Sequence, residues 1–176
     1  MVALRLCLST PDPQQAASRC TSSYILAPDC QFRLLSLAPM QSLFHLAIHV
    51  RDLDEARHFY GGTMGCTEGR STTTWVDFDF FGHQLSLHRG EPFATTRTGH
   101  VGDTLVPMPH FGLVLPLPQW QALAERLQAA GTDFIFAPQV RFAGQPGEQW
   151  TMFFCDPSGN PLEIKGFHSF ETVYAT

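Results

Sequence analysis

The feature of this sequence that most constrains its fold is a strand pattern that occurs twice. Residues 45–50 read HLAIHV and residues 110–115 read HFGLVL, so each segment starts with a histidine and continues with small and larger apolar residues. Because side chains on a strand point alternately to its two faces, each segment predicts a strand with one apolar face and a second face that carries the histidine. The recurrence indicates an internal duplication.

A short helix is predicted after each of these strands. Asp52 suits the N-cap of the first helix, and Glu55 three residues later completes a capping box. In the second helix, Pro118 suits the first turn and Gly131 suits the C-terminal cap. Apolar residues recur at helical spacing in both segments: Leu53, Ala56 and Phe59 in the first, and Trp120, Leu123, Leu127 and Ala130 in the second.

Short alternating segments complete each half of the chain. They are residues 75–80 and 82–88 after the first helix, and residues 134–136, 150–155 and 161–167 after the second. Each half therefore follows the order strand, helix and further strands. The predicted fold is α+β, with two βαβββ modules that form an open, barrel-like mixed sheet around a metal cleft.

The duplication also predicts the domain boundaries. Residues 1–39 contain three of the five cysteines and no sustained strand or helix period, which predicts a poorly ordered or mis-annotated extension ahead of Met40; an arm docked on the domain is the alternative. The domain itself is expected over residues 40–170, with module 1 at about 43–90, a linker at about 91–108, module 2 at about 109–168, and a tail at 171–176.

Composition narrows the class of partner. The 11 Lys and Arg residues are scattered and the net charge is -5, so the basic surface that nucleic acid requires is missing. No apolar run of about 18 residues occurs, which argues against a membrane-spanning helix. The missing basic surface favours a small-molecule partner. The five cysteines form no CxxC pair, so we expect a reducing, cytoplasmic setting.

Three residues are candidates for a metal site. Glu163 lies between Leu162 and Ile164, and a carboxylate on a buried strand requires a cation or a metal as its partner. If the two modules enclose one cavity, His45, His110 and Glu163 converge there. Two imidazoles and one carboxylate are the ligand set typical of mononuclear non-haem Fe(II).

Three segments resemble the vicinal oxygen chelate superfamily, which includes glyoxalase I, the extradiol catechol dioxygenases, and the fosfomycin and bleomycin resistance proteins. They are FHLAIHVRDLDEARHFY, HFGLVL and FFCDPSGNPLEIKGF, within a similarity that covers about residues 43–167. A bacterial group of predicted extradiol-type dioxygenases is the most similar. The resemblance implies that His45, His110 and Glu163 bind a divalent metal, which chelates two adjacent oxygens of the substrate. Ser86 stands where glyoxalase I supplies another carboxylate.

The resemblance and these residues together predict a metal-dependent, dioxygenase-like enzyme that acts on a small organic substrate. Fe(II) is the favoured metal, with Zn, Mn or Ni as alternatives. Two other functions stay open: a glyoxalase-like lyase, isomerase or thiol transferase on the same site, and a non-catalytic, ligand-sequestering resistance protein.

Strand parity adds three further candidates. His49 and His88 are candidate proton-handling residues or simple cleft-rim residues. Lys165 shares the face of Glu163 and either orients an anionic substrate or pairs with the carboxylate. Because modules of two chains can close the cavity together, a homodimer is expected. The sequence leaves open whether the site forms within one chain or between two.

Overall fold

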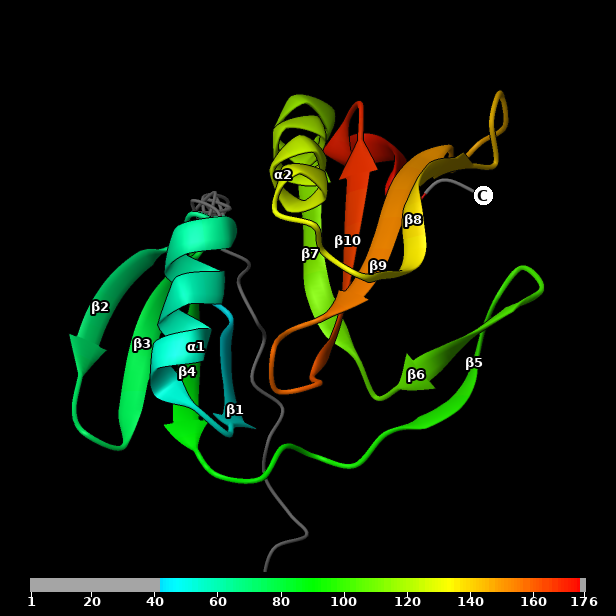
Figure 1. Ribbon diagram of the computed structural model, residues 1–176. Coiled ribbons are helices and arrows are strands. Elements are labelled where there is room, and N and C mark those ends of the chain that lie inside the picture. The colour runs from blue at the N-terminus through cyan, green and yellow to red at the C-terminus, as the bar shows by residue number, and fades with distance from the viewer. Residues whose placement is uncertain (1–41, 175–176) are drawn as a thin grey trace, which may run out of the picture. The chain divides into compact units, whose positions relative to one another are not determined.

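The computed structural model describes residues 42–174 (Figure 1). The extension predicted for residues 1–39 lies outside these residues, as do the last two residues of the predicted tail. The elements are, in order, β1 (His45–Val50), α1 (Leu53–Ala56), η1 (Arg57–Thr63), β2 (Thr67–Ser71), β3 (Trp75–Phe80), β4 (His83–Arg89), β5 (Thr96–Val101), β6 (Thr104–Met108), β7 (Phe111–Pro116), α2 (Leu117–Ala129), β8 (Phe134–Arg141), β9 (Gln149–Cys155), β10 (Pro161–Phe167) and η2 (Phe170–Thr172).

The sheet topology confirms the predicted duplication. One four-stranded sheet has the order β1-β4-β3-β2 and the other has the order β7-β10-β9-β8. In both, the first and last strands of the module pair in parallel and the other pairs are antiparallel. The registers also match, because Ala47 pairs with Ser86 and the equivalent Gly112 pairs with Glu163. Ser86 therefore occupies in the first module the place of Glu163 in the second.

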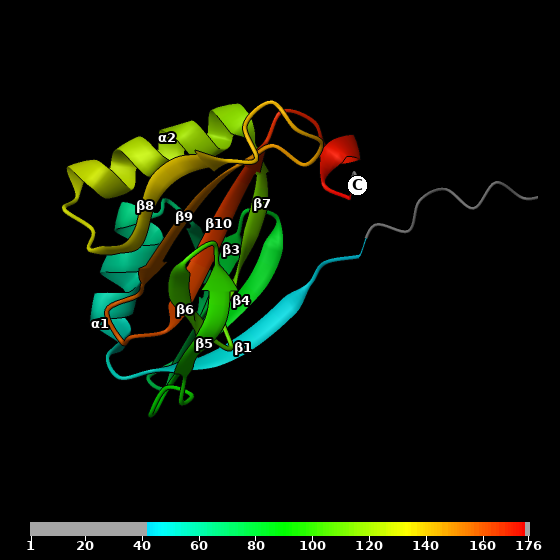
Figure 2. The ribbon, with the colours of Figure 1, turned by 90° about the vertical axis from the view of Figure 1, so that its right-hand side faces the viewer.

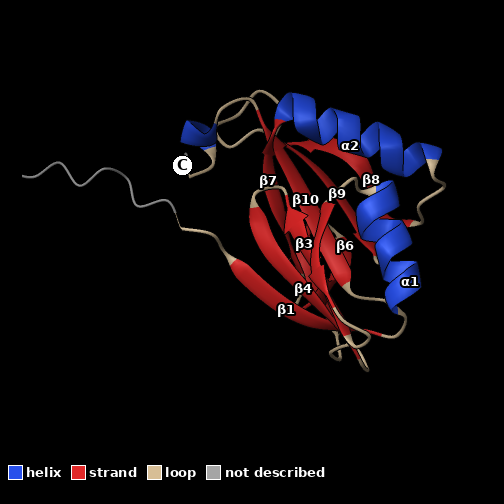
Figure 3. Cartoon of the chain, turned by 90° about the vertical axis from the view of Figure 1, so that its left-hand side faces the viewer, coloured by secondary structure: helices blue, strands red, loops and turns tan. Residues whose placement is uncertain are grey.

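Each sheet buries the face that its helix covers (Figure 3). The alternation predicted for β1 and β7 holds, since Ile48, Val50, Leu113 and Leu115 are buried on this face. These residues belong to one hydrophobic cluster, to which β3, β4, β9, β10 and both helices contribute. Each buried side chain of this size contributes about 1.5–3 kcal/mol. The opposite face of each sheet carries the histidines and the polar side chains, and we call these the polar faces.

The N-cap of the first helix and the glycine after the second follow the predicted signals. Asp52 caps α1, because its Oδ1 accepts hydrogen bonds from the backbone N–H groups of Asp54 and Glu55 at 2.8 and 2.9 Å. The helix continues into η1, a π-helical stretch that buries Phe59 and Tyr60. At the end of α2, Gly131 has φ +71°, the left-handed conformation that favours glycine after a helix.

Two parts of the chain differ from the sequence prediction. The segment predicted to be a linker includes the hairpin β5–β6 (Figure 2), and β2 was not predicted at all. All five residues of β2 are exposed, so this edge strand has no apolar alternation and is defined by its backbone pairing with β3. In the hairpin, a register shift between Arg97 and Gly99 interrupts the alternation of side chains between the two faces.

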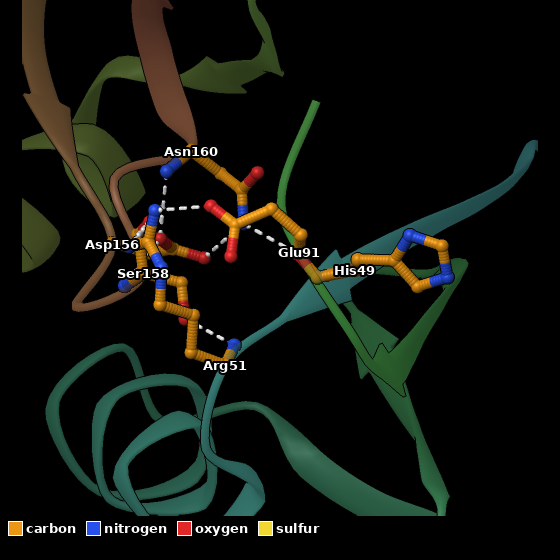
Figure 4. Close-up of polar contacts among 6 residues, drawn as sticks. All are labelled: His49, Arg51, Glu91, Asp156, Ser158 and Asn160. Atoms are coloured by element: carbon orange, nitrogen blue, oxygen red, sulfur yellow. Dashed lines mark hydrogen bonds and ion pairs between the residues drawn. The ribbon is translucent and has the colours of Figure 1, made fainter. Parts of the chain in front are cut away.

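The turn between β9 and β10 joins the second module to the first. The Asp156 carboxylate accepts hydrogen bonds from the hydroxyl of Tyr60 in η1 at 3.0 Å and from the side chain of Asn160 at 2.9 Å. Asn160 also donates to the backbone oxygen of His49, and Ser158 Oγ accepts from the Arg51 N–H (Figure 4). Polar contacts of this kind fix the turn against the end of β1.

Candidate metal centre

Two of the predicted metal ligands lie together on the polar face of the second sheet. His110 precedes β7 and Glu163 lies on the neighbouring strand β10, and their Nε2 and Oε2 atoms are 3.4 Å apart. The side chain of His110 is 21% exposed and that of Glu163 is 11% exposed. Gly112 makes this arrangement possible, because a Cβ there would lie 1.6 Å from the backbone oxygen of Glu163.

The backbone fixes the tautomer of His110. Its Nδ1 lies 2.9 Å from the carbonyl oxygen of Pro107, and a carbonyl oxygen only accepts hydrogen bonds. Nδ1 therefore carries the proton, and in the neutral ring Nε2 presents its lone pair. This is the usual arrangement of a metal-binding histidine, whose second nitrogen donates to a carbonyl or carboxylate.

A hydrogen bond from the neighbouring strand β9 also positions the Glu163 carboxylate. Thr151 on β9 is 1% exposed and donates from Oγ1 to Glu163 Oε1 at 3.1 Å. This bond directs Oε2 to the side where His110 and Lys165 lie, and the Lys165 Nζ is 3.5 Å from Oε2. The ring of Phe153, itself buried, packs edge-on against the His110 ring with centroids 4.9 Å apart. Both donor atoms are thus held before any ligand binds.

This pair fits a divalent metal. With the proton on Nδ1, the Nε2 lone pair of the neutral ring faces a carboxylate oxygen, and two acceptors side by side are stabilised by a cation between them. Their 3.4 Å separation is that of two ligands each about 2.1 Å from one ion. An imidazole nitrogen and a carboxylate oxygen suit Fe(II), Zn, Mn or Ni.

The third predicted ligand lies on the other sheet. His45 starts β1, is exposed, and shares the polar face of the first sheet with the side chain of its strand partner Gln84. Within residues 42–174 of one chain, no three or more His, Cys, Asp and Glu side chains form a group that could hold a metal ion. Within these residues, His45 is therefore not brought to His110 and Glu163 inside one chain.

The polar face of the first sheet contains a carboxylate whose environment the sequence did not reveal. The alternation in β3 predicts Asp77 and Asp79 on a solvated face; Asp79 is exposed, but Asp77 is only 7% exposed. Asp77 accepts hydrogen bonds from Ser86 at 2.5 Å, Arg70 at 3.1 Å and Gln84 at 3.3 Å. Burial opposes its ionisation, but these hydrogen bonds outweigh it and hold the Asp77 pKa below the ordinary value.

The remaining candidates lie near the rim of this face. His49 and His88 are directly paired across β1 and β4, and both are exposed. His88 also packs near Trp75, with ring centroids 6.3 Å apart. The His49 ring points away from the polar contacts of the β9–β10 turn (Figure 4), and Gly90 leaves room for it, since a Cβ there would lie 2.8 Å from the ring.

Comparison with known proteins identifies the family. Residues 42–164 match the family model described as the glyoxalase/bleomycin resistance protein/dioxygenase superfamily. The chain belongs to this superfamily. A crystal structure of a glyoxalase/bleomycin resistance protein/dioxygenase from Alicyclobacillus acidocaldarius is 32% identical in sequence, with a TM-score of 0.62 over 76% of this chain and 97% of that one. This agrees with the predicted resemblance and with the modular fold.

More distant superfamily structures share the fold. The fosfomycin resistance protein FosX from Listeria monocytogenes is 17% identical, with a TM-score of 0.55 over 76% of this chain and 98% of that one. A lactoylglutathione lyase from Agrobacterium tumefaciens is 19% identical, with a TM-score of 0.52 over 74% and 97%. No functionally curated protein matches the chain significantly. Among the described residues, no helix is long and apolar enough to cross a membrane.

Proposed function

We propose that this superfamily member is a metal-dependent, dioxygenase-like enzyme that binds a small organic substrate through two adjacent oxygens. The observation that carries the proposal is the pair of His110 Nε2 and Glu163 Oε2, 3.4 Å apart, in which the Pro107 carbonyl holds the imidazole proton on the far nitrogen. A divalent metal, with Fe(II) favoured, would supply Lewis-acid and template chemistry at this pair.

His45 completes the site in this proposal, and it comes from a second copy of the chain. It occupies in the first module the place of His110 in the second, on the polar face of the first sheet. In a homodimer with two-fold symmetry, the first module of each chain meets the second module of the other, so two equivalent sites form. Each site then has two imidazoles and one carboxylate.

The other polar residues act on the substrate. Lys165 supplies a cation beside the bound oxygens and is 35% exposed, so it is accessible to an anionic substrate. His49 and His88 stand on the His45 side and are the candidates for proton transfer, because imidazole exchanges protons near neutral pH. Cys66 and Cys155 form no disulfide within residues 42–174, which is compatible with a reducing, cytoplasmic setting.

Elemental analysis and oxygen uptake test the proposal. Protein purified without added metal is expected to contain iron, and H110A and E163Q are expected to lose it. Turnover of a substrate candidate should consume oxygen and stop under anaerobic conditions. Undiminished turnover without oxygen would replace this proposal by a redox-neutral lyase, isomerase or transferase, and tight ligand binding in the presence of a chelator would replace it by a sequestering protein.

A further inference from the structure

The polar face of the first sheet contains a hollow that the proposed metal site does not use. Its volume is about 500 Å³, and Gly69, Arg70, Asp77 and Gln84 are among the residues that line it. Gln84 is the strand partner of His45, so the hollow lies on the same face as the proposed third ligand and next to it. A substrate bound at the metal site can therefore extend into this hollow.

Two contacts position Arg70 beside the hollow and leave most of its side chain exposed. Its NH2 group donates to Asp77 Oδ2 at 3.1 Å, and its guanidinium carbon lies 6.0 Å from the centre of the Trp75 ring. Nevertheless, 79% of its side chain is exposed. A guanidinium has five N–H donors, and only one has a partner among the described residues. The others are available to a ligand.

The buried carboxylate of Asp77 positions the guanidinium of Arg70 through a hydrogen bond. Asp77 already accepts from Ser86 and Gln84, so its charge is compensated by neutral donors as well as by Arg70. A fixed guanidinium that keeps free N–H groups matches a carboxylate ligand, because its planar fork donates two parallel hydrogen bonds. The exposed carboxylate of Asp79 also lines the hollow. The anionic end of a ligand is therefore favoured only where the free N–H groups of Arg70 reach it.

We propose that Arg70 binds a carboxylate at the end of the substrate opposite to its metal-chelating oxygens. Asp77 lies on β3, two strands across and two residues along from His45 on β1. With about 4.8 Å between strands and about 3.4 Å per residue, this end lies roughly 12 Å from His45. The substrate class is an elongated small organic acid with two adjacent oxygens at its far end. This inference rests on the proposed function, because that function places the substrate oxygens beside His45.

Two matched probes test the assignment in the metal-loaded protein. One is 3-(3,4-dihydroxyphenyl)propanoate, which carries a carboxylate on a two-carbon arm opposite two adjacent hydroxyls, and the other is its neutral amide. Their dissociation constants are measured by calorimetry without oxygen. Wild type is expected to bind the acid about tenfold more tightly than the amide, which is the gain from one charge-assisted hydrogen-bonded pair.

Variants assign this preference to one side chain. R70Q is expected to bind both probes equally, and R70K to keep only part of the preference, because lysine lacks the planar fork. R57Q removes the same charge on the helix side, where Arg57 pairs with Asp54 and Glu68, and should keep the full preference. Metal content should stay at the wild-type level in all three variants.

The outcomes separate this inference from the proposed function. A wild-type protein that chelates both probes equally, or an R70Q protein that retains the preference, would overturn the inference and leave the metal site standing. Failure of the metal-loaded protein to bind either probe would overturn the proposed function, and the inference with it.

Discussion

The contact between Tyr60 and Asp156 gives the sharpest stability prediction. Tyr60 is completely buried in η1 of the first module, and its hydroxyl donates to a carboxylate in the second module that is 4% exposed. The substitution Tyr60→Phe removes only this hydroxyl and keeps the ring contacts with Phe59 and Phe78. A hydrogen bond to a charged acceptor contributes about 1.5–3 kcal/mol, so Y60F should lower the free energy of unfolding by that amount.

Ionisation of Asp156 adds a pH dependence to this loss. Burial raises the pKa of Asp156 above its usual range, although hydrogen bonds from Asn160, Tyr60 and Ser158 oppose the shift. A raised pKa in the folded state means that this group's contribution to stability is present in acid and is lost as the pH rises through that pKa. Removing the Tyr60 donor raises the pKa further, so the penalty of Y60F should be larger at pH 7 than at pH 4.

Urea denaturation at both pH values measures this effect. With a slope of about 2 kcal/mol per molar urea, the midpoint at pH 7 should fall by about 1 M. Y174F is the matched control, because Tyr174 is 90% exposed and a surface change of this kind shifts stability by about 0.5 kcal/mol at most. A Y60F penalty at pH 7 no larger than that of Y174F would refute the reasoning.

Three further predictions concern the polar faces and the buried thiol. T151V, which keeps the shape of Thr151 but loses the hydrogen bond to Glu163, should weaken metal binding about tenfold in a competition titration, whereas T151S retains it. The pKa of Asp77 is lowered in the folded state, so its contribution is present at neutral pH and is lost in acid; urea titrations should show that D77N costs more at pH 7 than at pH 3. Burial raises the pKa of Cys66 to about 12, so peptide mass spectrometry should find it unalkylated at pH 8 until the protein is unfolded.

The apolar periodicity of the sequence was sufficient to predict the modules. Alternation in HLAIHV and HFGLVL identifies which face of β1 and β7 meets the core, because burial of one face fixes the register of a strand. The sequence also gives Ser86 the place that Glu163 has in the second module, and the structure pairs Ser86 with Ala47 as it pairs Glu163 with Gly112. Strands without an apolar face, such as β2, depend on backbone pairing alone and leave no such pattern.

The environment of individual polar residues could not be predicted in this way. Alternation separates Asp77 and Asp79 from the core, but it does not distinguish an exposed carboxylate from one covered by side chains of neighbouring strands. Arg70 reaches Asp77 from β2, a strand that the sequence did not predict. Likewise, the periodicity places His45 and His110 on polar faces, whereas the convergence that we propose for them requires two chains to pair.

Complementation between two variants tests the proposed shared metal site most directly. H45A and H110A each remove one ligand, and neither homodimer should bind metal tightly. In a mixed dimer, His45 of the H110A chain meets His110 and Glu163 of the H45A chain, so one complete site returns. After equal mixing through unfolding and refolding, half of the dimers are mixed, and metal content should recover to about a quarter of the wild-type value. No recovery in dimers shown to be mixed would contradict a site built from two chains.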